Sequence, residues 1–590
     1  MTFDQAALFL IMGGVLGLLL WGRWRYDVVA FGALVLAVLI GVVDARHAFE
    51  GFGHAAVIVI ALVLIISRGL AQSGAIEMLT RNLIKADRPL PVHIAIMGGV
   101  GAALSAFMNN VAALALLMPV DIQTARRARR SPALSLMPLS FATILGGMTT
   151  MIGTPPNIVI AQFRADALGK PYGMFDFTPV GLGAAAVGLA FVALIGWRLI
   201  PAGRAKADAH KELAALEAYV MEVLVPEKSP AIGRKFRDLK AQAEEADVWL
   251  LGLVRRGRRT SRPAGEEIRK GDVLVIEGSP EGLEQFASAL RLDLSRSRKH
   301  GSLLADTLAM AEAVVPKDAR IIGRSAQSLR LLARRGVILV GIARHGRRVK
   351  GRVRQEKIQP GDLLLLMGPE NGLEETIRWL GALPLESKAV AVAQRQKAWL
   401  AMGLFGLAIV AAAAGLAPLP VALAAVVVGY VALRIISLSQ IYESVEWPVI
   451  VLLASLIPIG AALETSGGTG LIAQSILWLT KGLSPVLVLL VIMIVTMTLS
   501  DMLNNVATVL VAGPVAVQVA RALSVNPDSM LMGVAVAASC AFLTPIGHKN
   551  NTIIMGPGGY SFGDYWRMGL PLELLILAVS VPLILVFWPL

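Results

Sequence analysis

The sequence predicts an all-α polytopic membrane protein with two inverted repeats, each containing a re-entrant hairpin and a broken helix, and an α+β soluble insert between them. Three observations predict this class. The chain has 590 residues, of which 56% are hydrophobic and 16% charged, so lipid must be the solvent for much of its surface. Long apolar segments recur in the same order in both halves. The basic residues concentrate between the halves.

The N-terminal membrane repeat is expected over residues 1–200. An apolar stretch of about 17 to 20 residues suffices to cross roughly 30 Å of hydrocarbon. Such stretches lie near 6–21, 28–44 and 54–70, followed by an amphipathic piece near 74–86 and apolar segments near 91–120, 134–160 and 176–200. The first stretch lacks the basic region and cleavage site of a signal peptide, so we expect it to be a retained span.

The soluble insert is expected in the cytoplasm because it is basic. Of the 55 Lys and Arg residues, 34 lie between 201 and 394, against 25 acidic residues there. This excess fits the positive-inside rule and predicts both chain termini on the outside. Nucleic-acid binding is not expected, because aromatic residues do not interleave with the Arg clusters and no binding motif is present.

The insert contains an internal repeat at an offset of 90 residues. The matching pairs are Val225-Pro226 with Val315-Pro316, Gly233-Arg234 with Gly323-Arg324, and Gly271-Asp272 with Gly361-Asp362. Each Gly-Asp pair precedes an apolar run, and an earlier strand-like run lies at 250–254 and at 337–343. Two tandem α+β modules, at 201–299 and 300–394, are therefore predicted.

The C-terminal membrane repeat, at 395–590, follows the pattern of the first. Its apolar segments lie near 398–415, 418–436, 446–463, 484–520, 529–556 and 568–589, with an amphipathic piece near 468–480. If 91–120 and 484–520 are hairpins that enter and leave on one side, each half crosses the membrane five times. An odd number of crossings makes the two halves inverted. If the hairpins are instead full crossings, each half gains two spans and the termini stay on the same side.

A polar motif also recurs between the halves. Asn109-Asn110-Val111-Ala112 with Pro119 returns as Asn504-Asn505-Val506-Ala507 with Pro514, at an offset of 395. Further on, the segment 153–157, Gly-Thr-Pro-Pro-Asn, has a looser counterpart in 544–547, Thr-Pro-Ile-Gly. Five identities in one register are difficult to attribute to chance, so the halves are predicted to share one structure.

The four polar breaks are the candidate substrate site. Helix-breaking residues inside apolar segments are tolerated mainly where they line a cavity in the protein, and a helix N-terminus there can hold an anion. The candidate substrate-binding residues are Asn109, Asn110, Thr154, Asn157, Asn504, Asn505, Thr544, Pro545 and Lys549. The alternative is that the asparagines are packing motifs between helices.

Ionisable and hydroxyl residues near the breaks are candidates for coupling to a cation, sodium or proton. They are Ser105, Asn109, Gly153, Asp501, Asn504, Gly547 and His548, and a sodium ion is envisaged near Asn109 and Asn504. Lys549 could give an anion a fixed positive charge or pair with a carboxylate such as Asp501; the alternative is a lysine that extends to water. His548 could carry a proton, or it could be a hydrogen-bonded structural histidine.

The motifs resemble those of the divalent anion/sodium symporter family of the ion transporter superfamily. The residues that carry the resemblance are 105–110, Leu117-Met118-Pro119, 144–147, 152–157, 544–547 and 556–560. The sulfate-permease-like branch is the most similar, because the insert resembles its two TrkA-C (RCK-C) domains. The family fold implies a homodimer, an elevator-type transport domain, and Ser-Asn-Thr motifs at the hairpin tips that bind substrate and sodium. Here the Ser positions are Met108 and Leu503, which offer no side-chain oxygen to sodium.

The resemblance implies a secondary transporter of sulfate, a dicarboxylate or a similar small anion, in the cell membrane. It also implies regulation through the insert, by a nucleotide or another small ligand, although no phosphate-cradling glycine loop is present. The alternatives are a ligand-gated anion channel and a membrane sensor. An enzyme is not expected, since no nucleophile, base and orienting group form a set.

Overall fold

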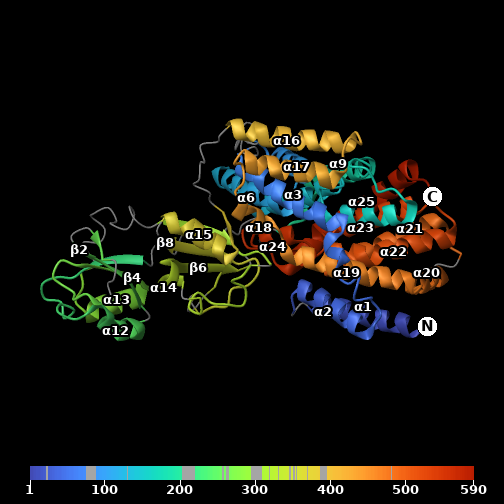
Figure 1. The fold of residues 1–590 in the computed structure, drawn as a ribbon. Coiled ribbons are helices and arrows are strands. Elements are labelled where there is room, and N and C mark those ends of the chain that lie inside the picture. The colour runs from blue at the N-terminus through green and yellow to red at the C-terminus, as the bar shows by residue number, and fades with distance from the viewer. Residues whose placement is uncertain are drawn as a thin grey trace. The chain divides into compact units, whose positions relative to one another are not determined.

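The computed structural model describes most of the chain (Figure 1). The residues outside the description are 22–23, 75–87, 129, 202–219, 247, 256–257, 261–264, 279, 294–308, 318, 330, 345–346, 350–352, 354, 369, 386–394 and 480–481. The chain forms two compact units, one of Met1–Ala207 with Ser387–Leu590 and one of Asp208–Glu386. The amphipathic piece expected near 74–86 lies, apart from Gly74, outside the described residues.

The first half of the helical unit contains two interrupted segments where polar residues were noted. Its elements are α1 (Phe3–Trp21), α2 (Tyr26–Ile40), η1 (Glu50–Gly53), α3 (Ala55–Gln72), α5 (Leu90–Ser105), α6 (Asn110–Arg127), α7 (Ala133–Gly147), α8 (Pro155–Leu168), α9 (Thr178–Leu194) and η2 (Gly196–Leu199). The segment near 91–120 is a helical hairpin with its tip at 106–109. The segment near 134–160 is broken at 148–154.

The second half repeats this arrangement. Its elements are α16 (Arg395–Ala413), α17 (Leu419–Ala432), α18 (Leu438–Ser444), α19 (Trp447–Thr465), α20 (Gly468–Leu479), α21 (Pro485–Met502), α22 (Asn505–Leu523), α23 (Pro527–Ser539), α24 (Lys549–Met555), η6 (Phe562–Asp564) and α25 (Tyr565–Phe587). The hairpin is α21 and α22, and the broken segment is α23 and α24. The short helix α18 was not predicted.

Several helices have the length and composition of membrane spans. In the described part of the chain, five are long and apolar enough to cross a bilayer: Ala55–Gln72, Trp447–Thr465, Pro485–Met502, Asn505–Leu523 and Phe562–Phe587. Shorter apolar helices accompany them, including both arms of the first hairpin, Leu90–Ser105 and Asn110–Ala125, whereas both arms of the second hairpin are long enough to cross.

The core of the helical unit is formed by α7 and α23. All residues of α7 except Leu134 are buried, from Ala133 to Gly147, and so are Asp528 to Ser539 of α23. α7 packs against α5, α6 and α9, and α23 packs against α21, α22 and α25. Each broken segment therefore begins with a helix enclosed by its own hairpin and by the last helix of its half.

The second unit contains two antiparallel sheets. The first has the order β1-β4-β2-β3, with β1 (Val220–Leu224), β2 (Val248–Arg255), β3 (Arg258–Arg259) and β4 (Val273–Gly278). The second has the order β7-β6-β8-β5-β9, with β5 (Ala309–Val314), β6 (Ile338–Arg344), β7 (Arg347–Arg348), β8 (Leu363–Gly368) and β9 (Leu383–Pro384). Figure 1 draws the first sheet in green and the second in yellow.

Four α-helices accompany the sheets in the described part of this unit. They are α12 (Lys240–Glu245) and α13 (Pro280–Ala289) in the first module, and α14 (Leu331–Arg335) and α15 (Glu370–Leu380) in the second. Each module has its own cluster of buried apolar residues. The β2–β4 register shifts between Leu250 and Gly252, and the β6–β8 register shifts between Leu339 and Gly341, so the same irregularity occurs in both copies.

The repeated Gly-Asp pair forms a turn that an arginine holds in each module. Gly361 has a φ of +80°, which glycine adopts at little cost. The Asp362 carboxylate accepts from Arg344 Nε at 2.8 Å and from the Gln359 backbone N–H at 2.8 Å. The hydrogen bond to Asp362 raises the pKa of Arg344 above its usual value. Arg255 and Asp272 form the corresponding pair in the first module.

Candidate functional site

The tip of the first hairpin is ordered by two asparagines with different tasks. The Asn109 side chain caps α6, its Oδ1 accepting from the Val111 backbone N–H at 2.8 Å. Asn110 Oδ1 accepts from Ser105 Oγ at 2.6 Å. Asn109 is half-buried and Asn110 is buried, so the first asparagine marks the helix start and the second fixes the two arms to each other.

The tip of the second hairpin repeats both interactions. Asn504 Oδ1 accepts from the Val506 backbone N–H at 2.9 Å, and Ser500 Oγ donates to Asn505 Oδ1 at 3.1 Å. All four residues lie 395 positions after their counterparts. Ser500 was not among the candidates, although adding the repeat offset to Ser105 points to it.

The first break is held against the first hairpin through Thr150. Its hydroxyl donates to the Ala106 backbone oxygen and accepts from the Gly153 N–H at 3.2 Å. Asn157 Nδ2 donates to the Thr150 backbone oxygen at 2.9 Å. These bonds satisfy backbone groups that the interrupted helix leaves without partners, as an apolar environment requires.

The second break uses the same arrangement. The Thr544 hydroxyl donates to the Asp501 backbone oxygen at 2.7 Å and accepts from the Gly547 N–H at 3.1 Å. Asn551 Nδ2 donates to the Thr544 backbone oxygen at 3.2 Å. Each break is therefore bonded to the tip of its own hairpin.

The hydrogen bonds correct the alignment of the two breaks. Thr544 occupies the position of Thr150, at an offset of 394, and His548 occupies the position of Thr154. The looser match of 153–157 with 544–547 was therefore wrong in register. The correct signal is Thr-x-x-Gly, at 150–153 and at 544–547. Thr150 was missed because an offset of 395 does not bring it onto Thr544.

Two glycines allow each break to lie close to the neighbouring backbone. A Cβ on Gly153 would lie 2.5 Å from the Gly147 backbone oxygen, and one on Gly547 would lie 3.0 Å from the Ser500 backbone oxygen. Backbone atoms cannot move aside as a side chain can. Gly153 and Gly547 thus shape the site and offer no side-chain ligand.

The second break also bonds to the first half. Asn550 Nδ2 donates to the Asn110 backbone oxygen at 3.1 Å and to Thr143 Oγ1 at 2.8 Å. His548 Nδ1 accepts from the Asn550 N–H at 3.1 Å, and His548 Nε2 lies 3.4 Å from Asn110 Nδ2. Because Nδ1 accepts, the proton of a neutral ring is on Nε2, so Nε2 and the Asn110 amide nitrogen are both donors and do not form a hydrogen bond with each other. Asn550 was not predicted as a site residue.

Lys549 does not face the residues that were predicted as its partners. Its Nζ lies 2.5 Å from Glu446 Oε2, at the residue before α19. The predicted pairing with Asp501 is therefore wrong, because the Asp501 carboxylate instead accepts from the Leu543 backbone N–H at 2.9 Å. Glu446 offsets the positive charge of Lys549, which weakens the proposal that this lysine gives an anion a fixed positive charge.

The remaining candidates lie within the breaks. Thr154 is the N-cap residue of α8 and makes no side-chain capping bond. Pro545 is buried, and its backbone oxygen accepts from Thr552 Oγ1 at 2.5 Å. Between the described side chains of Asn109 and Asn504 there is no hydrogen bond. The structure thus joins the second break to the first hairpin but does not join the two tips directly.

The hairpin tips fit sodium only in part. Asn109 and Asn504 each have an amide oxygen that retains one free lone pair after capping. Met108 and Leu503 are buried, at 2% and 4% exposure, and supply no oxygen. Within the described residues, His, Cys, Asp and Glu form no group of three or more suited to a metal. Further ligands for sodium would have to be backbone carbonyls.

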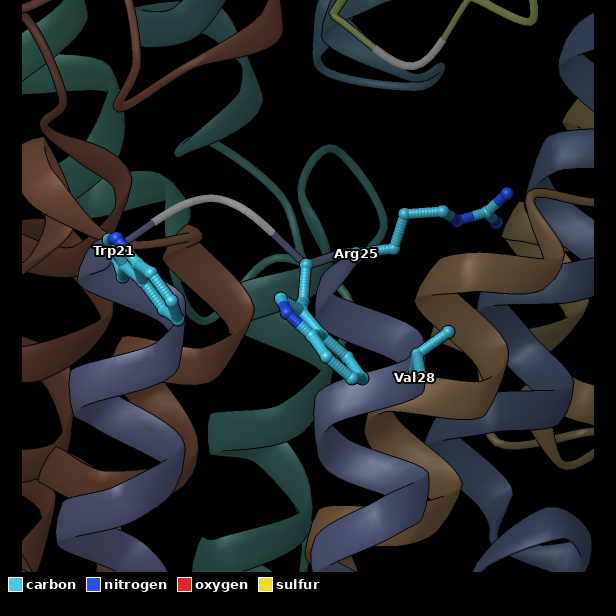
Figure 2. A pocket seen from close by; sticks show the side chains of 4 residues that line it. Trp21, Arg25 and Val28 are labelled. Carbon is cyan, nitrogen blue, oxygen red and sulfur yellow. The ribbon is translucent and has the colours of Figure 1, made fainter.

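A separate surface pocket lies between the ends of α1 and α2. Figure 2 shows Trp21 on the first helix and Val28 on the second, with Arg25 near the connection; Trp24 also lines the pocket. Two exposed tryptophans beside an arginine are typical of the region where a membrane meets water. None of the candidate residues lines this pocket.

Comparison with known proteins identifies the family. A family model described as citrate transporter matches residues 16–491 and 470–590. The chain belongs to this family. It is 32% identical to an uncharacterized transporter of Synechocystis sp. over 95% of this chain and 93% of the relative. The family confirms that the chain is a transporter and not an enzyme.

Two more distant likenesses complete the comparison. A probable sodium/sulfate cotransporter of Chlamydomonas reinhardtii is 26% identical over 55% of this chain and 38% of its own length. The crystal structure of the Alcanivorax borkumensis YdaH transporter matches 94% of this chain and 90% of its own chain, with 13% identity and a TM-score of 0.43. The resemblance to divalent anion symporters is confirmed at the level of the transporter family.

Proposed function

We propose that this chain is a secondary transporter of a small anion with several acidic oxygens, such as citrate, a dicarboxylate or sulfate, driven by a cation gradient. The single observation that carries the proposal is the repeated hairpin tip. In both halves an asparagine caps a long helix, and a serine–asparagine bond fixes the arms. The N-termini of α6 and α22 present backbone N–H groups to an anion.

The family description and the name of the sulfate cotransporter support this substrate class. The same name supports sodium as the coupling ion. We further propose a homodimer with elevator-type movement, a cytoplasmic insert of TrkA-C type that regulates transport through a small ligand, and both termini outside. The basic charge of the insert supports its place in the cytoplasm.

Transport can be tested with purified protein in proteoliposomes. Labelled citrate, succinate and sulfate are each offered with and without an inward sodium gradient. We expect saturable counterflow of at least one anion. Flux that does not saturate and shows no counterflow would favour a channel, and the absence of flux for all three anions would contradict the proposed substrate class.

The asparagine assignments can be tested by Asn110→Ala and Asn505→Ala. Each substitution removes the amide that binds a serine across the hairpin, so we expect a raised KM for the anion. Asn526→Ala is the matched control, because Asn526 caps α23 outside the tips. Control-like KM values in both tip variants would argue against these residues.

A further inference from the structure

Two carboxylic acids of the second half lie side by side on consecutive backbone N–H groups. Asp501 is near the end of α21, and its Oδ1 accepts from the Leu543 N–H at 2.9 Å. Glu573 is in α25, and its Oε1 accepts from the Phe542 N–H at 3.4 Å. The two carboxyl groups are also within hydrogen-bonding reach of each other.

The pair is deeply buried, and no counter-charge lies beside it in the part of the chain that the structure describes. Asp501 is 3% exposed and Glu573 is 6% exposed. Asp501 Oδ2 is fully buried and has no hydrogen-bond donor among the described residues. Cys540 is a further titratable side chain near the pair. It is 0% exposed and carries no positive charge.

Charged groups on the elements packed against α25 have other partners. Asp528 of α23 binds Arg164, Asp564 of η6 accepts from the Ser561 N–H, and Arg198 of η2 lies over the Trp197 ring. The sequence of α9 contains no ionisable residue. Among the described residues, the elements packed against α25 therefore offer no cation to neutralise two carboxylates.

The pair has no counterpart in the first half, although the surrounding structure is repeated. At the hairpin offset of 395, the position of Asp501 is taken by Ala106. In the last helix of each half, Gly181 lies against the Met148 carbonyl as Gly569 lies against the Phe542 carbonyl. That match sets an offset of 388 and places Ala185 at the position of Glu573. The scaffold thus forms without either acid.

Electrostatics favours one proton on this pair while the pair is buried. Two carboxylates in contact repel each other, and burial penalises each charge further. A single proton converts the repulsion into a hydrogen bond between a carboxylic acid and a carboxylate, as in other carboxyl dyads. The unpartnered Asp501 Oδ2 then acquires a donor or becomes one.

We propose that Asp501 and Glu573 together form a binding site for one transported proton. The site takes up H⁺ from water to give one O–H bond, shared between a neutral acid and a carboxylate, and releases the same H⁺ by breaking that bond. This inference rests on the proposed transport function, names the proton as a coupling ion at this site, and adds Glu573 to the candidate residue Asp501. Its position is suitable, because the Asp501 backbone oxygen also accepts the Thr544 bond that joins hairpin and break.

The proposal predicts different losses in different transport modes. Glu573→Gln keeps a neutral group of the same size and imitates the permanently protonated pair. We expect proteoliposomes with this variant to retain counterflow of labelled citrate, succinate or sulfate, whichever the wild type carries. We expect them to lose accumulation driven by an inward proton gradient in sodium-free buffer. Asp501→Asn should behave alike, and Glu464→Gln, with a half-exposed acid at the end of α19, should behave as wild type.

Three outcomes would overturn the proton site. One is proton-driven accumulation by Glu573→Gln at the wild-type rate. The second is a wild type that accumulates anion with sodium alone and ignores the proton gradient. The third is loss of sodium-driven but not proton-driven uptake in Glu573→Gln, which would identify a sodium site. A wild type that moves no anion contradicts the transport function and not the proton site.

A second measurement needs no substrate. Infrared difference spectra of the full chain, recorded between acidic and alkaline buffer, should show the C=O stretch of one buried carboxylic acid. We expect this band to disappear in the double variant Asp501→Asn/Glu573→Gln and to persist in Glu464→Gln. An unchanged band in a folded double variant would refute a shared proton.

Discussion

The hydroxyl of Thr544 connects the second hairpin to the second break through three hydrogen bonds. It donates to the Asp501 backbone oxygen and accepts from the N–H groups of Ile546, at 3.2 Å, and Gly547. A valine has nearly the same shape but leaves these backbone groups without a partner in an apolar environment. The cost of an unsatisfied group is about 1–3 kcal/mol.

Thr544→Val is therefore expected to lower the thermal unfolding midpoint of the detergent-solubilised protein and to reduce the maximal transport rate. Thr498→Val is the matched control, because the exposed Thr498 hydroxyl on α21 donates to the Ile494 carbonyl within its own helix. Equal midpoints for the two variants would show that the Thr544 network contributes no stability.

The sequence predicted the asparagine tips at residue level because each motif is contiguous and recurs in a constant register. It could not predict Glu573, which lies 72 positions after Asp501 in an apolar helix without a repeat partner. It also assigned Lys549 the wrong partner, since Glu446 comes from a different segment. Contacts between distant segments are set by packing, which leaves no local pattern in the sequence.

At the level of elements, the Gly-Asp turns of the two modules depend on their arginine pairs. Asp362 is fully buried, and its carboxylate binds Arg344 and a backbone N–H. Asp362→Asn retains the shape of the side chain but removes its charge. The amide NH₂ that replaces one carboxylate oxygen then faces either Arg344 or the Gln359 N–H, and two donors cannot form a hydrogen bond with each other. Hydrogen bonds to charged groups contribute about 1.5–3 kcal/mol, so we expect the second module to open more readily.

Limited proteolysis of the full chain measures this opening as the rate of cleavage within 309–385. Glu227→Gln is the control, because Glu227 and Lys270 form an ion pair that is exposed on both sides. The proximity of Lys270 lowers the pKa of the Glu227 carboxyl, yet an exposed pair contributes little to stability. Faster cleavage in both variants, or in neither, would contradict the assigned role of Asp362.

The strand-like runs and turns of the insert were predictable because turn chemistry is local. The run at 250–254 lies within β2, and the run at 337–343 overlaps β6. The helix interruptions were indicated by Asn, Gly and Pro inside apolar segments. The register of the second break was not indicated by the sequence. The loop between the hairpin and the broken helix is shorter in the second half, at 524–526, than in the first, at 128–132.

At the scale of the whole helical unit, the ion pair of Lys549 and Glu446 joins two parts of the second half. Glu446 precedes α19, whereas Lys549 begins α24. Both side chains are largely buried, with 19% and 29% exposure. Removing one partner leaves the other charge poorly solvated, while removing both does not.

A double-mutant cycle tests this pair. We expect Lys549→Met and Glu446→Gln each to lower the transport rate, and the double variant to recover part of the loss, measured as anion counterflow. Additive losses would show that the two groups are not coupled. Uptake by Lys549→Met with unchanged anion KM would confirm that the lysine does not bind the substrate.

The single thiol of the chain offers a practical route to measuring movement. Cys540 is completely buried at the start of the second break, so maleimide labels would not reach it while the segment stays closed. Spin labels could then be attached to cysteines introduced on α19 and α24 without first removing a native thiol. Any slow reaction at Cys540 itself would report the moment when this interior is exposed to water.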